Sequence, residues 1–219
     1  MADKKLVLFD LDGTLVDNFR AIYNCTTYCC KKLGIDVPVY EDVVGAVGGS
    51  ILVTMSKLFD EEYVEPIAKI YLDNFYQYIY DGLTLMPHSV ELLSYLRENN
   101  YKIALFTNKE ELAAKEILNR LGIFPYFNAI TGTTLHSPRK PDLEFTLGAL
   151  DKLSIDPADA LIIGDSLYDY NSSQNANVDC LLVTTGTVSR EVLEETALNA
   201  KGIYANFKEL AKGYFATDL

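Results

Sequence analysis

The sequence is poor in positive charge and has no long apolar run. Its 219 residues contain 19 lysines and arginines against 31 aspartates and glutamates, which leaves a net charge of −12. Such an acidic chain is a poor general binder of nucleic acid or of anionic membranes, because both require a cationic surface that neutralises phosphate. No apolar stretch approaches the roughly 20 residues of a membrane span, and residues 1–5 lead directly into a predicted strand. We therefore expect a cytoplasmic protein.

Cysteine and histidine are also scarce, with four and two residues. Cys25 and Cys29 share one face of a predicted helix, and no nearby Cys or His completes the spacing of a zinc site. We expect all four cysteines to be reduced, small core residues. Neither histidine has a partner pattern that suggests catalysis, so both are predicted to be surface or hydrogen-bonded structural residues. The residues concerned are Cys25, Cys29, Cys30, Cys180, His88 and His136.

What the chain does contain is a series of short apolar runs separated by helical patterns. Hydrophobic residues make up 49% of the chain, enough for a well-packed interior. Apolar runs that end in glycine or acid are typical of strands buried on both faces of a parallel sheet. The alternation predicts an α/β fold with a doubly wound parallel sheet. The predicted strands are Leu6–Phe9, Lys102–Phe106, Ala129–Ile130, Ala160–Ile163, Cys180–Val183 and a short edge strand at Gly202–Tyr204.

Residues 17–82 interrupt this alternation with helical patterns alone. Helices are predicted over residues 17–33, from residue 41, over 50–59 and over 62–80. A helical insert between the first strand and the rest of the sheet indicates a small cap domain on two connectors. We therefore predict a core of residues 1–16 and 83–219 and an α-helical cap of residues 17–82. The alternative is a single elaborate crossover that does not move as a unit.

The first predicted strand ends in two carboxylates, Asp10 and Asp12, followed by Gly13. Because the two aspartates lie two residues apart, their side chains point to roughly the same side, and Gly13 lets the chain turn. Like charges held this close repel, so the arrangement favours a bound cation. Carboxylate oxygens without histidine indicate Mg²⁺. Taken alone, the motif could also be an ordinary turn rich in aspartate.

Three later segments place polar side chains at the same edge of the predicted sheet. Thr107 and Asn108 follow a strand, where they could hold a phosphate oxygen or cap the next helix. Lys140 precedes a proline on a defined loop, so its ammonium can offset a carboxylate and a phosphoryl group. Asp165 follows another strand and is positioned to complete the metal site. Asp169 could hydrogen-bond a metal-bound water or Lys140, or cap a helix.

These motifs, in this order, resemble the haloacid dehalogenase-like superfamily and most of all its phosphoglycolate phosphatase-like hydrolases. The resemblance covers nearly the whole chain. It implies that Asp10 attacks phosphorus to form a phosphoaspartyl intermediate, that Asp12 acts as acid and base, and that Mg²⁺ is bound by the Asp10 side chain, the Asp12 backbone carbonyl and Asp165. The residues that would stabilise the transferring group are Thr107, Asn108 and Lys140. The family often shows Lys-Pro-x-Pro at the lysine motif, and Leu143 replaces the second proline here.

The resemblance predicts a Mg²⁺-dependent phosphatase for a small phosphorylated metabolite such as phosphoglycolate, as a monomer or homodimer. Asp12 disfavours the dehalogenase branch, which lacks an acid–base residue there. The alternatives are an inorganic pyrophosphatase, a sugar phosphomutase of the β-phosphoglucomutase type, and a non-catalytic metabolite-binding protein. The loop Gly45–Ser50 of the predicted cap could set specificity or be a flexible turn. Arg20 could meet a substrate carboxylate or lie on a solvated helix face.

Overall fold

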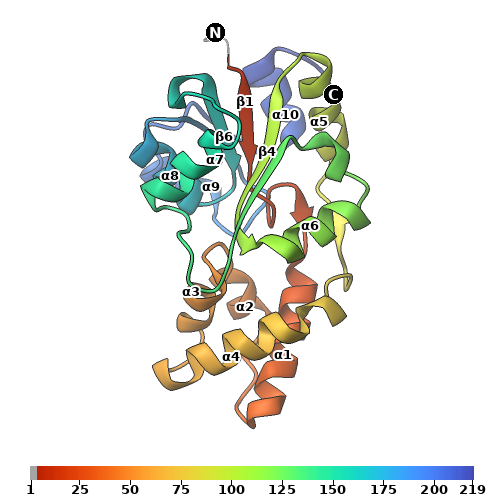
Figure 1. Cartoon of the computed structure of the whole chain (residues 1–219), viewed down its shortest axis with the longest axis vertical. Helices are drawn as coiled ribbons and strands as arrows, with labels where there is room; N and C mark the ends of the chain where they lie inside the picture. The colour runs from red at the N-terminus through yellow and green to blue at the C-terminus, as the bar shows by residue number, and fades with distance from the viewer. Residues whose placement is uncertain (1–3) are drawn as a thin grey trace.

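The computed structural model describes residues 4–219 as a parallel sheet flanked by helices, with a block of helices at one end (Figure 1). The sheet has the strand order β5-β4-β1-β6-β7-β8, and each neighbouring pair is parallel. Its strands are β1 (Leu6–Phe9), β4 (Lys102–Glu110), β5 (Ala129–Thr133), β6 (Ala160–Gly164), β7 (Asp179–Val183) and β8 (Gly202–Tyr204). The predicted α/β fold with a parallel sheet is confirmed, including its edge strand.

Both faces of the sheet are buried, because alternate residues of each strand enter two separate hydrophobic clusters. In β1, Val7 and Phe9 belong to one cluster, and Leu6 and Leu8 to the other. A strand covered on both faces has no position for a polar side chain, which explains the continuous apolar run. The first cluster also draws on α5 (Ser89–Glu98), α6 (Glu111–Arg120) and α10 (Phe207–Leu210), which a π-helical turn, η4 (Ala211–Phe215), follows. The second draws on α7 (Leu143–Asp151), α8 (Leu167–Ala176) and α9 (Arg190–Thr196).

The helical block lies beyond the carboxyl ends of the strands (Figure 1). It is attached through a two-stranded antiparallel ribbon, in which β2 (Val16–Asp17) pairs with β3 (Thr84–Leu85). The block occupies the stretch 17–82, for which the sequence predicts a cap. Its elements are α1 (Phe19–Leu33), α2 (Tyr40–Ala46), α3 (Ile51–Ser56), α4 (Glu61–Asn74) and the 3₁₀ turn η1 (Phe75–Gln77). The other 3₁₀ turns within residues 4–219 are η2 (Phe124–Tyr126) and η3 (Pro157–Asp159).

The largest departures from the predicted bounds are in one strand and one helix. The strand expected to end at Phe106 continues to Glu110, because its last part pairs with β5 across an irregularity in the register. Thr107 and Asn108 therefore lie within β4 and not after it. The helix expected over residues 62–80 ends at Asn74, whose side-chain amide donates to the carbonyl of Ile70. This bond competes for the oxygen that the helix backbone uses.

All four cysteines are buried and free, as predicted. Cys25 donates a weak hydrogen bond to the carbonyl of Tyr71, at 3.7 Å, which joins α1 to α4. No helix in the described part of the chain has both the length and the apolar character needed to cross a membrane.

Candidate active site

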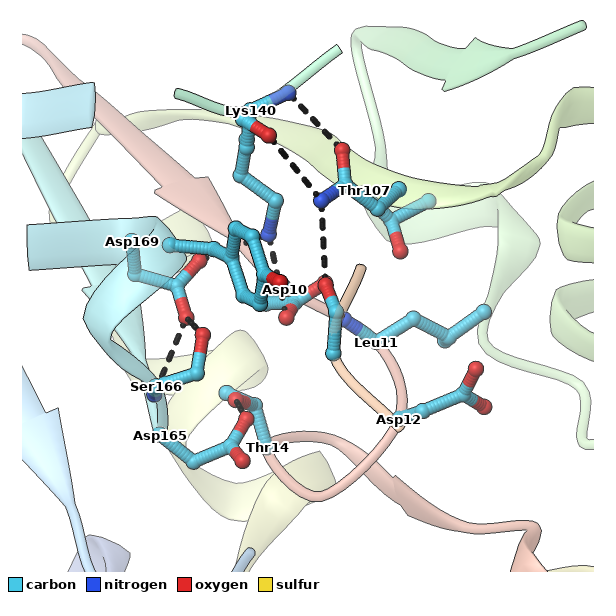
Figure 2. Close-up of polar contacts among 12 residues, drawn as sticks. Asp10, Leu11, Asp12, Thr14, Thr107, Lys140, Asp165, Ser166 and Asp169 are labelled. Carbon is cyan, nitrogen blue, oxygen red and sulfur yellow. Dashed lines mark hydrogen bonds and ion pairs between the residues drawn. The ribbon is translucent and has the colours of Figure 1, made fainter. Parts of the chain in front are cut away.

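The acidic residues of the candidate site gather where β1 and β6 end. Asp10 directly follows β1, and Asp165 directly follows β6. The two strands are parallel neighbours, with Phe9 beside Ile163, so the residues after them meet. One carboxylate oxygen from each of Asp10, Asp165 and Asp169 lies within 4.8 Å of the others, and all three residues are buried (Figure 2). Asp10 and Asp165 are thus close enough to share one cation.

Lys140 lies between two of these carboxylates. Its Nζ is 2.6 Å from Oδ1 of Asp169 and 3.0 Å from Oδ2 of Asp10, and its side chain is 0% exposed. Burial works against the charge of Lys140, but the two carboxylates outweigh it and raise its pKa above the ordinary lysine value. The amide oxygen of Asn108 accepts the backbone N–H of Lys140 at 2.8 Å and holds the loop. The ammonium is therefore a fixed positive charge beside Asp10.

Both oxygens of Asp169 are engaged within the protein. Oδ1 pairs with Lys140, and Oδ2 accepts the backbone N–H and the hydroxyl of Ser166 at 3.1 and 2.6 Å. Ser166 and Asp169 together form the capping box that begins α8. Two of the roles that the sequence left open for Asp169 are thus filled by one side chain, which caps the helix and holds Lys140. The Ser-x-x-Asp spacing was the signal for Ser166, which the sequence analysis did not single out.

The acidic cluster carries more negative charge than Lys140 neutralises. Burial, opposed by Lys140, raises the pKa of Asp10 to about 6. Burial and the charges of Asp10 and Asp169 raise the pKa of Asp165 well above its usual range. Thr14 donates its hydroxyl to Oδ1 of Asp165 at 2.6 Å, while Oδ2 has no hydrogen-bond partner among residues 4–219. Excess negative charge on oxygen ligands alone fits a hard divalent cation such as Mg²⁺.

Two glycines leave room for the carboxylate of Asp165. Gly13 has a φ of +83°, and a Cβ there would lie 2.7 Å from Oδ2 of Asp165. A Cβ on Gly186 would overlap the same oxygen. The neighbouring hydroxyl of Thr185 donates to the carbonyl of Gly13 at 2.7 Å and ties the two loops together. Gly13 is recognisable from its motif, whereas the role of Gly186 depends on a contact between distant segments.

The side chain of Asp12 points away from Asp165 and Asp169 (Figure 2). Its Oδ2 lies 2.8 Å from Nζ of Lys109, with 12% and 8% of the two side chains exposed. The amide of Asn18 donates to its Oδ1 at 3.4 Å. The carboxyl of Asp12 is therefore outside the acidic cluster. The sequence analysis missed Lys109, although its position directly after Thr107 and Asn108 was a signal.

A pocket lies between the carboxyl ends of the strands and the helical block. Asp10, Asp12, Thr107 and Asn108 lie on its wall. The loop predicted to face the site, Gly45–Ser50, contributes Val47, Gly48 and Gly49 to the wall. The side-chain amide of Asn108 donates to the carbonyls of Gly48, at 3.0 Å, and Lys140, at 3.3 Å, and so connects the core to the block.

Arg20, His88 and His136 are not on the pocket wall as far as the structure describes it. The guanidinium of Arg20 stacks over the ring of Tyr40, 4.4 Å from its centroid, on an exposed part of α1. His88 precedes α5, and its Nδ1 lies 3.8 Å from Glu91. His136 is exposed.

Comparisons with known proteins agree with this fold and site. Residues 7–183 match the family described as haloacid dehalogenase-like hydrolase. A phosphoglycolate phosphatase of Aquifex aeolicus is 32% identical over 188 residues, which cover 84% of this chain and 86% of the relative. A putative pyrophosphatase of Caldanaerobacter subterraneus is 31% identical over 191 residues, 86% of each chain. The crystal structure of a predicted phosphatase from Clostridium acetobutylicum, 29% identical, superposes with a TM-score of 0.88 and covers 98% of this chain and 99% of its own.

The chain therefore belongs to the haloacid dehalogenase-like hydrolases. Its curated relatives assign it to the phosphatases of that family.

Proposed function

We propose that this protein is a Mg²⁺-dependent phosphatase that hydrolyses a small phosphate monoester through a phosphoaspartyl intermediate on Asp10. The observation that carries the proposal is the position of Asp10, which faces the pocket and lies within reach of both Lys140 and Asp165. A carboxylate nucleophile needs orientation, a positive charge beside it and an open approach, and Asp10 has all three.

Asp10 is the nucleophile of the proposed reaction. Its Oδ1 accepts the N–H of Leu11 at 2.7 Å, and its Oδ2 pairs with Lys140, so both oxygens are oriented. One oxygen attacks phosphorus while the bond to the leaving oxygen breaks. Asp12 gives its proton to that oxygen and then takes one from the water that cleaves the acyl phosphate. Inorganic phosphate leaves, and Asp10 is restored as a carboxylate.

The metal would be held by the side chains of Asp10 and Asp165 and by the backbone carbonyl of Asp12, with Asp169 supporting the site through Lys140. When bound, Mg²⁺ neutralises charge on the phosphoryl oxygens.

Donors of the chain would bind the phosphoryl oxygens from β4. The hydroxyl oxygen of Thr107 accepts the N–H of Lys109 at 3.2 Å, which leaves its proton for a phosphoryl oxygen. The side-chain amide of Asn108 is committed to Lys140 and Gly48 here, so its contribution is to hold the Lys140 loop in place.

The helical block would act as the cap, with residues 17–82 as one unit and residues 1–16 and 83–219 as the core. The hydrogen bond from Asn108 to Gly48 joins the two at the pocket, so an opening movement of the cap would have to break it. Closure over the substrate would keep bulk water from the phosphoaspartate until the leaving group departs.

The substrate we propose is phosphoglycolate or a similarly small phosphate ester, in a cytoplasmic protein that is a monomer or homodimer. The support comes from the relatives, since several that match over most of the chain are named phosphoglycolate phosphatase. Inorganic pyrophosphate is the second candidate, because another relative of similar identity is named a putative pyrophosphatase.

The test is Mg²⁺-dependent release of phosphate from p-nitrophenyl phosphate, phosphoglycolate and pyrophosphate. We expect turnover by the wild type with Mg²⁺, none with EDTA, and none by Asp10→Asn. Asp36→Asn, a change of the same chemistry at an exposed position, serves as the matched control and should retain full activity. Turnover by Asp10→Asn equal to that of the wild type would exclude the covalent route. A phosphoryl adduct on the peptide that contains Asp10, found by mass spectrometry after an acid quench, would support it directly.

A further inference from the structure

Lys109 is a nearly buried ammonium at the pocket whose role the proposed reaction leaves open. Its side chain is 8% exposed, and its Nζ lies 2.8 Å from Oδ2 of Asp12. On the side of the helical block, the ring of Phe75 lies 4.6 Å from the ammonium. A cation in such a place needs negative or electron-rich partners, because little water reaches it.

The rest of the pocket wall supplies no other positive charge for a ligand. Among residues 4–219, Lys109 is the one lysine or arginine that lines the pocket. Glu110, its acidic neighbour on the wall, is occupied, because its Oε2 accepts the N–H of Ala113 at 2.7 Å and is approached by the hydroxyl of Tyr76 at 3.5 Å. The helical block adds mostly apolar and aromatic wall residues, among them Ile22, Ile51, Tyr71, Leu72 and Phe75. A charge at Lys109 is thus weakly screened.

The position of Lys109 matches the leaving-group end of the substrate. In the proposed reaction the leaving oxygen lies at the carboxyl of Asp12, which Lys109 contacts, and the phosphoryl group lies at Asp10 and Lys140. A substituent a few bonds beyond the leaving oxygen would therefore reach the ammonium of Lys109. A longer leaving group would have to pass Phe75 and the helical block.

We propose that Lys109 binds a second anionic group, carried by the leaving group close to the oxygen that departs. This inference rests on the proposed function and adds the residue that would select a phosphate ester or anhydride whose leaving group is itself a small anion. The anion can be a carboxylate or a phosphate, since both accept charge-assisted hydrogen bonds from an ammonium. A leaving group whose far end is neutral cannot form this hydrogen bond with Lys109.

The competing role is purely positional, with Lys109 holding Asp12 and touching no substrate. The two roles differ in their dependence on the leaving group. Loss of a positional lysine slows every substrate by a similar factor, whereas loss of an anion-binding lysine slows the anionic ones more.

The experiment compares Lys109→Met with the wild type on two substrate pairs that differ at the far end of the leaving group. Phosphoglycolate is paired with ethyl phosphate, and pyrophosphate with methyl phosphate. We expect Lys109→Met to reduce the preference for the anionic member, as a ratio of kcat/KM values, by about 10- to 100-fold, the usual effect of one charge-assisted bond. The pair that loses its preference identifies the anion as carboxylate or phosphate. Lys109→Arg should keep more of the preference than Lys109→Met.

Each other outcome is decisive. An equal loss on both members of both pairs would make Lys109 a positional residue and overturn the inference, while the proposed function would stand. A wild type without preference for either anionic member would also overturn the inference and leave the proposed function standing. A wild type that hydrolyses none of the four with Mg²⁺ would overturn the proposed function, and the inference with it.

Two further measurements guard against a folding defect. Lys115→Met removes a lysine from the exposed side of α6, where it pairs with Glu111 outside the pocket, and should leave all four rates unchanged. Inhibition by glycolate of p-nitrophenyl phosphate hydrolysis reports binding at the leaving-group end alone. Its inhibition constant should rise about 10-fold or more in Lys109→Met.

Discussion

Replacing Lys140 by methionine removes the ammonium that lies between Asp10 and Asp169 but keeps most of the side-chain volume. The side chain is 0% exposed, and its Nζ lies 3.0 and 2.6 Å from the two carboxylates. The variant leaves both acids buried without a counter-charge, a change that costs about 3–5 kcal/mol in comparable buried pairs. This is a large part of the ordinary stability of a folded domain, about 5–15 kcal/mol.

Urea denaturation in EDTA measures this cost, followed by circular dichroism or by the fluorescence of the 15 tyrosines, since the chain has no tryptophan. The free energy of unfolding of Lys140→Met should fall by about 3–5 kcal/mol. Adding Asp169→Asn removes one of the two uncompensated charges while an amide oxygen can still accept from Ser166. The double variant should therefore regain about 1–3 kcal/mol relative to Lys140→Met.

Activity separates the two functions of Lys140. The double variant should stay as slow as Lys140→Met despite its recovered stability, with kcat lower than the wild type by about 10²–10³, because the positive charge beside the transferring group is still absent. A double variant no more stable than Lys140→Met would refute the charge-balance reasoning. A Lys140→Met protein as stable as the wild type would do the same.

Two further predictions concern the metal site. Because burial raises the pKa of Asp10 to about 6 and also raises that of Asp165, protons compete with Mg²⁺ as the pH falls. The apparent affinity for Mg²⁺ in calorimetric titrations should be at least about tenfold weaker at pH ~5 than at pH ~7, and equal affinities would contradict this reasoning. Gly186→Ala forces Asp165 to move, so this variant should weaken Mg²⁺ binding at least about tenfold. The control is Gly148→Ala, in α7, where no atom lies near the added Cβ. This control should keep the affinity for Mg²⁺ and gain about 0.5–1 kcal/mol of stability. Unchanged binding in Gly186→Ala would show that Asp165 is not a ligand.

The sequence by itself determined the strands of the sheet and the identity of the acidic residues at their ends. A run such as Leu6–Phe9 specifies a strand buried on both faces through its composition alone. Parallel strands share one carboxyl edge, so the convergence of Asp10, Lys140 and Asp165 followed from local pattern and chain direction.

The tertiary structure alone decided the contacts around those residues. Lys109 and Asp12 are 97 residues apart, and Thr14 and Asp165 are 151 apart. Their pairing depends on which strands are neighbours and on how far β4 continues past Phe106. The hydrophobic periodicity of a short segment predicts neither. Periodicity reports whether a side chain is buried, whereas the partner of a buried charge is set by the segments that fold against it.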